Sequence, residues 1–215
     1  MNAPVIDRPN ISEEVAAALR EMIFRGELVG GASVNEAQLV SRLGVSRTPL
    51  REALAMLVAE RAIDHFPRRG FFVRPLSAEE ATEIYALRPI LEPPALRLAG
   101  LPSGADLDEL RAINGRLAEA KDSWAAIQLD DEWHSKLICR CPNRTLIEMI
   151  EHVTRRTHRY ELAVMGPRQI LSSSVQRHRE ILDALGKGDL EEGCELLKSN
   201  VTDGLDPVLR WLANR

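Results

Sequence analysis

Arginines gather at two places in the first third of the chain, with a spacing that suits contact with nucleic acid. Arg47 and Arg51 are four residues apart, so on a helix they project from the same face. A second basic pair, Arg68 and Arg69, stands directly before Gly70. The guanidinium group donates its hydrogen bonds in a rigid fork that matches phosphate oxygens and the edge of guanine. These arginines therefore indicate recognition of double-stranded DNA.

A second set of polar side chains, further along the chain, is of the kind that binds metal ions. Asp130 and His134 are four residues apart and share one helical face. His178 and Asn200 flank the short connection 186–189 and would lie at comparable heights on the two helices of a hairpin. Carboxylate and imidazole are suitable ligands for zinc, nickel or manganese. The set predicts either a divalent metal inside a helical bundle or a hydrogen-bonded polar cluster without metal.

The first pair of arginines must be positioned by two helices joined through a tight turn. Leu39 and Leu43 are one helical turn apart, and Gly44 suits the left-handed conformation that ends a helix. Ser46 is a candidate N-cap of the next helix, and Pro49 falls in its first turn, where proline is tolerated. The pattern predicts a helix-turn-helix, with the arginines at the start of the second helix, where this motif meets DNA.

The second basic pair lies in residues 65–73, which look like two short strands around a basic tip, a wing. A helix is expected from Ser12 to Gly26. We therefore assign residues 11–75 to a winged helix-turn-helix domain, preceded by a mobile arm over residues 1–10.

Helical periodicity dominates everything after the wing. Ser77 and Glu80 match a capping box, so a helix should begin there and should kink or break at Pro89, Pro93 and Pro94. Further helices are expected at about 105–120, 123–140, 144–165, 170–186 and 189–212. The predicted fold is mainly α: the winged helix-turn-helix followed by an all-α antiparallel bundle over residues 76–215.

Residues from about Ile11 to Leu76 closely resemble the winged helix-turn-helix of the GntR family of bacterial transcription regulators. The match rests on Gly26-Glu27-Leu28, on the block from Gly44 to Leu54 and on Pro67-Arg68-Arg69-Gly70. The rest of the chain resembles the FadR-type effector domain of that family, called FCD. The resemblance implies a homodimer on a pseudo-palindromic operator, with DNA contacts from Ser46, Arg47, Thr48, Arg51, Arg68, Arg69 and Gly70.

The resemblance also implies an effector site in the helical domain. Many FCD domains hold a divalent metal with an Asp-x-x-x-His pair and two later histidines; Asp130, His134 and His178 match the first three ligands. The fourth position falls on Asn200, whose amide is a weaker ligand that water can replace. Arg88 matches a position that often faces the cavity, so the expected effector is a small carboxylate. A further cluster of arginines has three possible roles, as part of the effector pocket, as a solvated helix face or as the rim of a dimer interface: Arg155, Arg156 and Arg159.

Composition and cysteine usage predict a cytoplasmic globular protein, whereas the net charge of the whole chain argues weakly against nucleic acid. The 215-residue chain has a net charge of −4, but residues 1–75 hold ten arginines against nine acidic residues. DNA binding must therefore depend on a local basic patch that a dimer doubles. The three cysteines are read as reduced thiols: Cys139, Cys141 and Cys194. No apolar run approaches the ~20 residues of a membrane helix.

The leading hypothesis is a ligand-responsive transcription regulator that is not an enzyme. One alternative is a metal-dependent enzyme built on the helical domain, but no general base, nucleophile motif or phosphate loop accompanies the metal residues. The other is a DNA-binding protein without an effector, which the large second domain and its convergent polar groups argue against.

Overall fold

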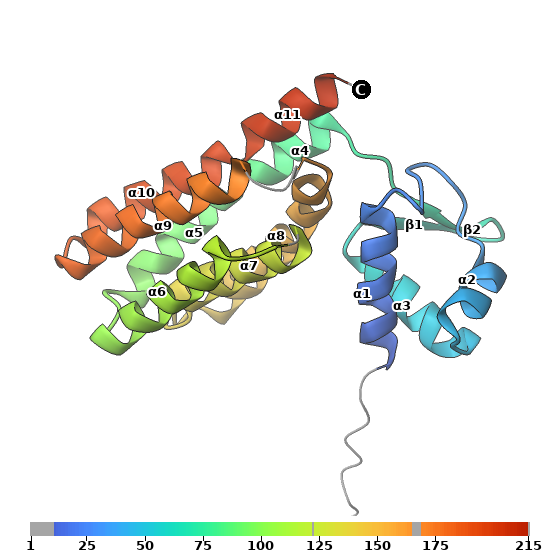
Figure 1. The fold of residues 1–215 in the computed structure, drawn as a ribbon, viewed down its shortest axis with the longest axis horizontal. Helices are drawn as coiled ribbons and strands as arrows, with labels where there is room; N and C mark the ends of the chain where they lie inside the picture. The colour runs from blue at the N-terminus through green and yellow to red at the C-terminus, as the bar shows by residue number, and fades with distance from the viewer. Residues whose placement is uncertain (1–10, 122, 165–168, 215) are drawn as a thin grey trace, which may run out of the picture. The chain divides into compact units, whose positions relative to one another are not determined.

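The computed structural model describes residues 11–121, 123–164 and 169–214, and most of these residues are helical (Figure 1). The chain divides into two compact units, Met1–Pro75 and Leu76–Arg215. The predicted mobile arm, residues 1–10, lies outside the described residues. The mainly α fold with a small two-stranded wing is confirmed. Among the described residues, no helix is long and apolar enough to cross a membrane.

The first unit consists of three helices and a β-hairpin. In chain order these are α1 (Ile11–Phe24), α2 (Glu36–Leu43), α3 (Arg47–Ala59), β1 (Ile63–Phe66) and β2 (Gly70–Val73). Leu19 of α1 and the leucines Leu50 and Leu54 of α3 are fully buried and pack with Ile63 and Val73 of the hairpin. Burial of these apolar side chains fixes the arginine-bearing face of α3 toward solvent.

The turn between α2 and α3 is formed as the residue types predict. Gly44 is left-handed, with φ of 65°, and its N–H donates to the Val40 carbonyl. Asn35 caps α2 by accepting from the Gln38 N–H, whereas Ser46, although it stands at the N-cap of α3, makes no side-chain capping hydrogen bond. The hydroxyl of Ser46 is thus left available to other partners.

The second unit is all helical. It contains α4 (Ala78–Tyr85), α5 (Arg88–Ala99), α6 (Gly104–Ala118), α7 (Ser123–Ile138), α8 (Arg144–Val164), α9 (Gln169–Gly186), α10 (Leu190–Asp203) and α11 (Leu205–Ala213). Helix α10 packs on both α5 and α9, and α6 packs on both α7 and α9, so the long helices form a bundle (Figure 1). Its main core includes fully buried Trp133, Leu96, Leu110, Ile181 and Leu197.

The expected break after Ser77 lies earlier than the sequence suggested. The helix ends at Tyr85 and α5 begins at Arg88, because Pro89 has no N–H to donate to the Tyr85 carbonyl. Pro93 and Pro94 were expected to interrupt the helix, but both lie inside α5.

The last predicted helix, 189–212, is in fact two helices that meet at Gly204. A Cβ atom at Gly204 would lie 3.1 Å from Cε1 of Tyr85, so the close approach of α4 favours glycine there. Glycine also lowers helical stability, which places the break at this residue.

Candidate functional site

The four arginines predicted to contact DNA lie at two exposed places in the first unit. Ser46, Arg47 and Thr48 are exposed at the beginning of α3, and Arg51 follows one turn later. The Arg51 Nε atom donates to Glu36 at 2.8 Å, in an ion pair that is exposed on the arginine side. The guanidinium of Arg47 makes no hydrogen bond or ion pair among the described residues. The helix therefore presents one unpaired and one loosely paired guanidinium beside each other.

Arg68 and Arg69 lie exposed at the tip of the hairpin, and Gly70 begins β2 behind them. The Arg69 N–H closes the turn by donating to the Phe66 carbonyl at 3.0 Å. Arg68 has a φ of 66°, which is uncommon for a residue with a side chain. The wing is therefore formed as expected, and the DNA contacts assigned to α3 and the wing remain predictions.

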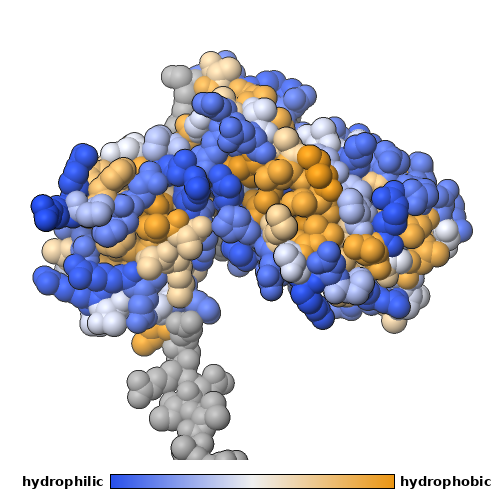
Figure 2. Space-filling view, turned by 180° about the vertical axis from the view of Figure 1, so that it is seen from behind, coloured by the Kyte–Doolittle hydropathy of each residue, from blue (hydrophilic) through white to orange (hydrophobic). Residues whose placement is uncertain are grey.

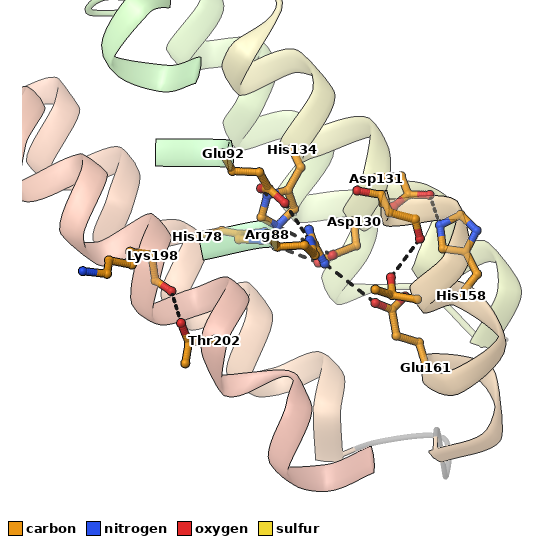
Figure 3. Close-up of polar contacts among 12 residues, drawn as sticks. Arg88, Glu92, Asp130, Asp131, His134, His158, Glu161, His178, Lys198 and Thr202 are labelled. Atoms are coloured by element: carbon orange, nitrogen blue, oxygen red, sulfur yellow. Dashed lines mark hydrogen bonds and ion pairs between the residues drawn. The ribbon is translucent and has the colours of Figure 1, made fainter. Parts of the chain in front are cut away.

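In the second unit, three candidate metal ligands converge inside the bundle. Asp130 and His134 come from α7, His178 comes from α9, and one ligand atom of each lies within 4.8 Å of the others. The Nε2 atoms of His134 and His178 lie 3.7 and 3.6 Å from the two carboxylate oxygens of Asp130. Both imidazoles are buried, and the aspartate is half-buried (Figure 3).

The other ring nitrogen of each histidine is held by a second polar residue. His134 Nδ1 lies 2.8 Å from a carboxylate oxygen of Glu92, which can only accept. His178 Nδ1 lies 3.1 Å from the Asn114 amide oxygen, because the Asn114 nitrogen donates to the Val175 carbonyl. Both Nδ1 atoms therefore carry the proton, and in the neutral rings each Nε2 lone pair is free to bind a metal. Nε2 of His178 is buried without a hydrogen-bond partner.

The electrostatics of the cluster keep His178 neutral. Burial, together with the nearby His134 and Arg88, lowers the pKa of His178 well below its usual value. Burial alone would lower the pKa of His134, but Glu92 outweighs it and raises the pKa. Burial raises the pKa of Asp130 despite the cations beside it. His178, which stacks on Trp133 with ring centroids 3.6 Å apart, is thus a preorganised neutral ligand.

Arg88, the predicted effector residue, is buried in the same cluster. Its Nε donates to Glu92 at 2.6 Å, and Nη1 lies 3.7 Å from Glu161 of α8. Its Nη2 atom is buried without a hydrogen-bond partner. In Figure 3 the guanidinium lies beside Asp130 and a dashed line joins it to Glu161, so its free donor lies in the neighbourhood of the metal ligands.

Asn200 is half-buried on α10, and no hydrogen bond or ion pair of the described residues joins its amide to the other three candidate ligands. Its role as fourth ligand therefore stays a prediction.

Sequence reasoning missed several members of the cluster, chiefly Glu92, Asn114 and Glu161. Glu92 and Asn114 stand 42 and 64 residues before the histidines that they contact. His158 also belongs to the cluster: its ring lies 2.7 Å from Asp131, and its pKa is raised because that carboxylate outweighs burial. The sequence feature that could have revealed Glu92 is its spacing of four residues from Arg88, which brings the two charges together on one face of α5.

Side chains from one turn of α8 also bind α4, the first helix of the second unit. Arg156 and Arg159 both donate to the buried carboxylate of Glu80 on α4. The Tyr160 hydroxyl donates to Glu80 at 3.1 Å and accepts from the Ser77 N–H at 3.4 Å. The predicted capping box is therefore half made: Ser77 caps the Glu80 N–H, but the Glu80 side chain turns to α8 instead. Arg156 and Arg159 belong to this network and are not a solvated face.

Comparison with known proteins gives matches over nearly the whole chain. The sequence model of the bacterial regulatory proteins of the gntR family matches residues 11–73, and that of the FCD domain matches residues 83–203. The uncharacterized HTH-type transcriptional regulator YdhC of Bacillus subtilis is 29% identical over 204 residues, which cover 86% of this chain and 90% of that protein. The HTH-type transcriptional repressor GlaR of Escherichia coli is 25% identical over 208 residues, with coverage of 91% and 94%. The solved structure of E. coli McbR/YncC is 25% identical and aligns with a TM-score of 0.77 over 94% of this chain and 99% of that one.

Proposed function

Because this chain is a DNA-binding transcription regulator that belongs to the GntR family and carries an FCD domain, we propose that a small organic acid controls it through a divalent metal site. The observation that carries the proposal is the buried triad of Asp130, His134 and His178, with an unpartnered Nε2 on His178. An orphaned ring nitrogen in a protein core is costly unless something binds it.

The residues present fit a divalent ion of the zinc, nickel or manganese type. Both histidines are fixed through Nδ1 by Glu92 and Asn114, the arrangement that orients imidazole ligands in metal sites. Carboxylates around the triad supply negative charge that a divalent cation would neutralise: Glu92, Asp130, Asp131 and Glu161. Asn200 or water completes the ligand set in this proposal.

A carboxylate effector would find two cationic groups in the same site. The free Nη2 of Arg88 can donate to one carboxylate oxygen. A bound metal with an open position supplies a Lewis-acidic site for another oxygen. Together the two groups favour an organic acid over its neutral amide or ester.

We further infer that the protein acts as a homodimer whose helical units meet through α5. An exposed apolar stripe with spacings of three and four residues runs along α5 and just beyond it: Leu87, Ile90, Pro94, Leu98 and Leu101. Seen from behind, where α5 lies toward the viewer, hydrophobic side chains gather on the helical unit (Figure 2). An apolar stripe at helical spacing can pack against the same stripe of a second copy about a two-fold axis, so a second copy is the partner we assign to it. Two winged helices then read a pseudo-palindromic operator.

The test of the metal is elemental analysis of tag-free protein purified without chelator, followed by thermal shift with zinc, nickel and manganese salts. We expect about one ion per chain and a raised melting temperature, both abolished by His134→Ala. His152→Ala, at an exposed histidine on α8, is the control and should keep the metal. Metal-free protein that shows no thermal shift with any of the three salts would leave only a hydrogen-bonded polar cluster.

The test of the effector uses a panel of small organic acids against metal-loaded protein. Acids that raise the melting temperature are then added to a duplex recovered by selection from random-sequence DNA. We expect at least one acid to change the affinity for that duplex, and Arg88→Lys to weaken the acid without removing the metal. If acids bind but never alter DNA affinity, control by an effector at this site is excluded.

A further inference from the structure

Two phenylalanines stand on the face of the wing that is turned away from the core. In the hairpin register Phe66 lies opposite Gly70, and Phe72 lies opposite Asp64. The alternate positions of β1 and β2, Ile63 and Val73, are the buried ones. Phe66 is 44% exposed and Phe72 is half-buried, so both rings are accessible on this face.

The two rings contact each other edge to face. Their centroids are 5.6 Å apart, with an angle of 73° between the planes. Phe66 lies beside Gly70, which has no side chain of its own to cover that part of the strand. The pair thus makes a small aromatic platform on the solvent side of the hairpin.

Arg69 lies on this platform. Its guanidinium carbon is 5.6 Å from the Phe66 ring centroid and 5.4 Å from that of Phe72. A guanidinium over aromatic rings is attracted by their π-electrons, and its N–H donors remain directed outward in its own plane. In the described part of the chain the guanidinium of Arg69 makes no hydrogen bond or ion pair, so all of these side-chain donors are available.

The backbone of the tip holds the arginine in this place. The hydrogen bond from the Arg69 N–H to the Phe66 carbonyl closes the turn at 3.0 Å, and Gly70 follows with a φ of 86°. The side chain of Arg69 therefore folds back over the ring of Phe66, the first residue of the turn. An arginine that is already ordered loses less conformational freedom when it binds.

We propose that Phe66 and Phe72 are positioning residues for DNA recognition, which hold the Arg69 guanidinium ready to contact phosphates or base edges at the wing. The inference rests on the DNA-binding function of the winged unit and adds two aromatic residues to the basic ones. The rings do not contact the DNA in this proposal; they act through Arg69.

The experiment is a double-mutant cycle on full-length protein, with the selected duplex as the probe. One arm replaces both rings (Phe66→Leu with Phe72→Leu), the second is Arg69→Ala, and the third combines them. Loss of the platform should weaken binding about three- to tenfold when Arg69 is present. The same ring substitutions should change nothing in the Arg69→Ala background.

The salt dependence of binding separates positioning from a structural role. Arg69→Ala should lower the slope of log affinity against log salt by about one per protomer, because one phosphate-directed charge is lost. The ring substitutions keep that charge and should keep the slope. Phe66→Tyr retains the ring and should restore wild-type affinity.

Three results would overturn the inference or its basis. A loss of affinity on ring substitution that persists in the Arg69→Ala background means that the rings contact DNA or only stabilise the hairpin. If the ring substitutions leave the DNA affinity unchanged while Arg69→Ala lowers it, the phenylalanines have no positioning role, although Arg69 still contacts DNA. Wild-type binding by Arg69→Ala itself removes the wing arginine from the DNA interface as well.

Discussion

At the scale of single residues, the buried carboxylate of Glu92 determines the charge of the two side chains that it contacts. It accepts from Arg88 and from His134, and its interactions with these two side chains outweigh its burial and lower its pKa to about 2. Glu92 is therefore ionised at any pH at which the protein works. It connects the candidate effector arginine to a candidate metal ligand.

The first prediction concerns the pH dependence of stability at Glu92. Its folded-state pKa is about 2, below the usual 4.5, so the stabilisation it provides is complete above pH 4.5 and is lost as the pH falls toward 2. Glu92→Gln should lower the free energy of unfolding of the helical unit by roughly 3 kcal/mol at neutral pH. Denaturant unfolding of metal-free protein at several pH values should show this difference shrinking between pH 4.5 and 2. Glu195→Gln, at an exposed position, is the control; a difference that is the same at pH 7 and pH 2 would contradict the prediction.

Residue types and local spacing were sufficient to find part of the metal site and not the rest. Asp130 and His134 share a helical face, which their spacing of four residues reveals. Asn114 and Glu92 come from α6 and α5 and meet the histidines only after the bundle has packed. No local periodicity encodes such contacts, since they depend on how helices are ordered in space.

At the scale of elements, the wing contains a turn that its own sequence does not favour. Arg68 adopts the left-handed conformation, where glycine is the usual residue, and it has no hydrogen bond or ion pair among the described residues. Such local strain is commonly kept where a side chain has a function.

The second prediction follows from that strain. Arg68→Gly should stabilise the DNA-binding unit by about 0.5 to 1 kcal/mol, because the left-handed position then costs little. The same change should weaken DNA binding, since one cation of the wing is gone. Arg68→Ala is the matched variant: it should lose a similar amount of affinity without the gain in stability. Thermal unfolding and duplex titration measure the two effects, and equal stability of the Gly and Ala variants would argue against strain.

The third prediction concerns the connection between α4 and α8. Glu80→Ala leaves the half-buried Arg156 and Arg159 without their carboxylate and should destabilise the helical unit by about 3 kcal/mol. Tyr160→Phe removes only the hydroxyl that links Ser77 to Glu80 and should cost about 1 kcal/mol. Denaturant unfolding gives both values. Equal effects of the two substitutions would mean that the ion pairs contribute nothing.

The elements themselves were largely predictable, and their interruptions were not. The Gly44 turn and the wing follow from residue types that permit one backbone conformation. The end of α4 at Tyr85 comes from Pro89, which has no N–H to donate, whereas the break at Gly204 lies where a Cβ atom would come within 3.1 Å of Tyr85 on α4. A helix signal read from one segment does not include the neighbour that ends it.

At the scale of the whole molecule, the fourth prediction tests the dimer proposed through α5. Ile90 is 63% exposed, so Ile90→Glu should change the stability of a single chain by less than about 0.5 kcal/mol. It should nevertheless convert the dimer to a monomer and weaken binding to a pseudo-palindromic duplex at equal protein concentration. Met149→Glu, at a residue 54% exposed on α8, is the control and should leave the dimer intact. Sedimentation gives the oligomeric state; a dimeric Ile90→Glu protein would exclude this face.

Each hydrophobic core of the described chain lies within one of the two units, and this separation has a calorimetric consequence. The core around Leu50 belongs to Met1–Pro75, and those around Trp133, Tyr160 and Leu117 belong to Leu76–Arg215. Cooperative melting requires a shared core, so the excess heat capacity of the full chain should resolve into two transitions. A ligand raises only the transition of the unit that holds it. A single scan therefore tells which unit an added metal, acid or duplex has bound, before any complex is solved.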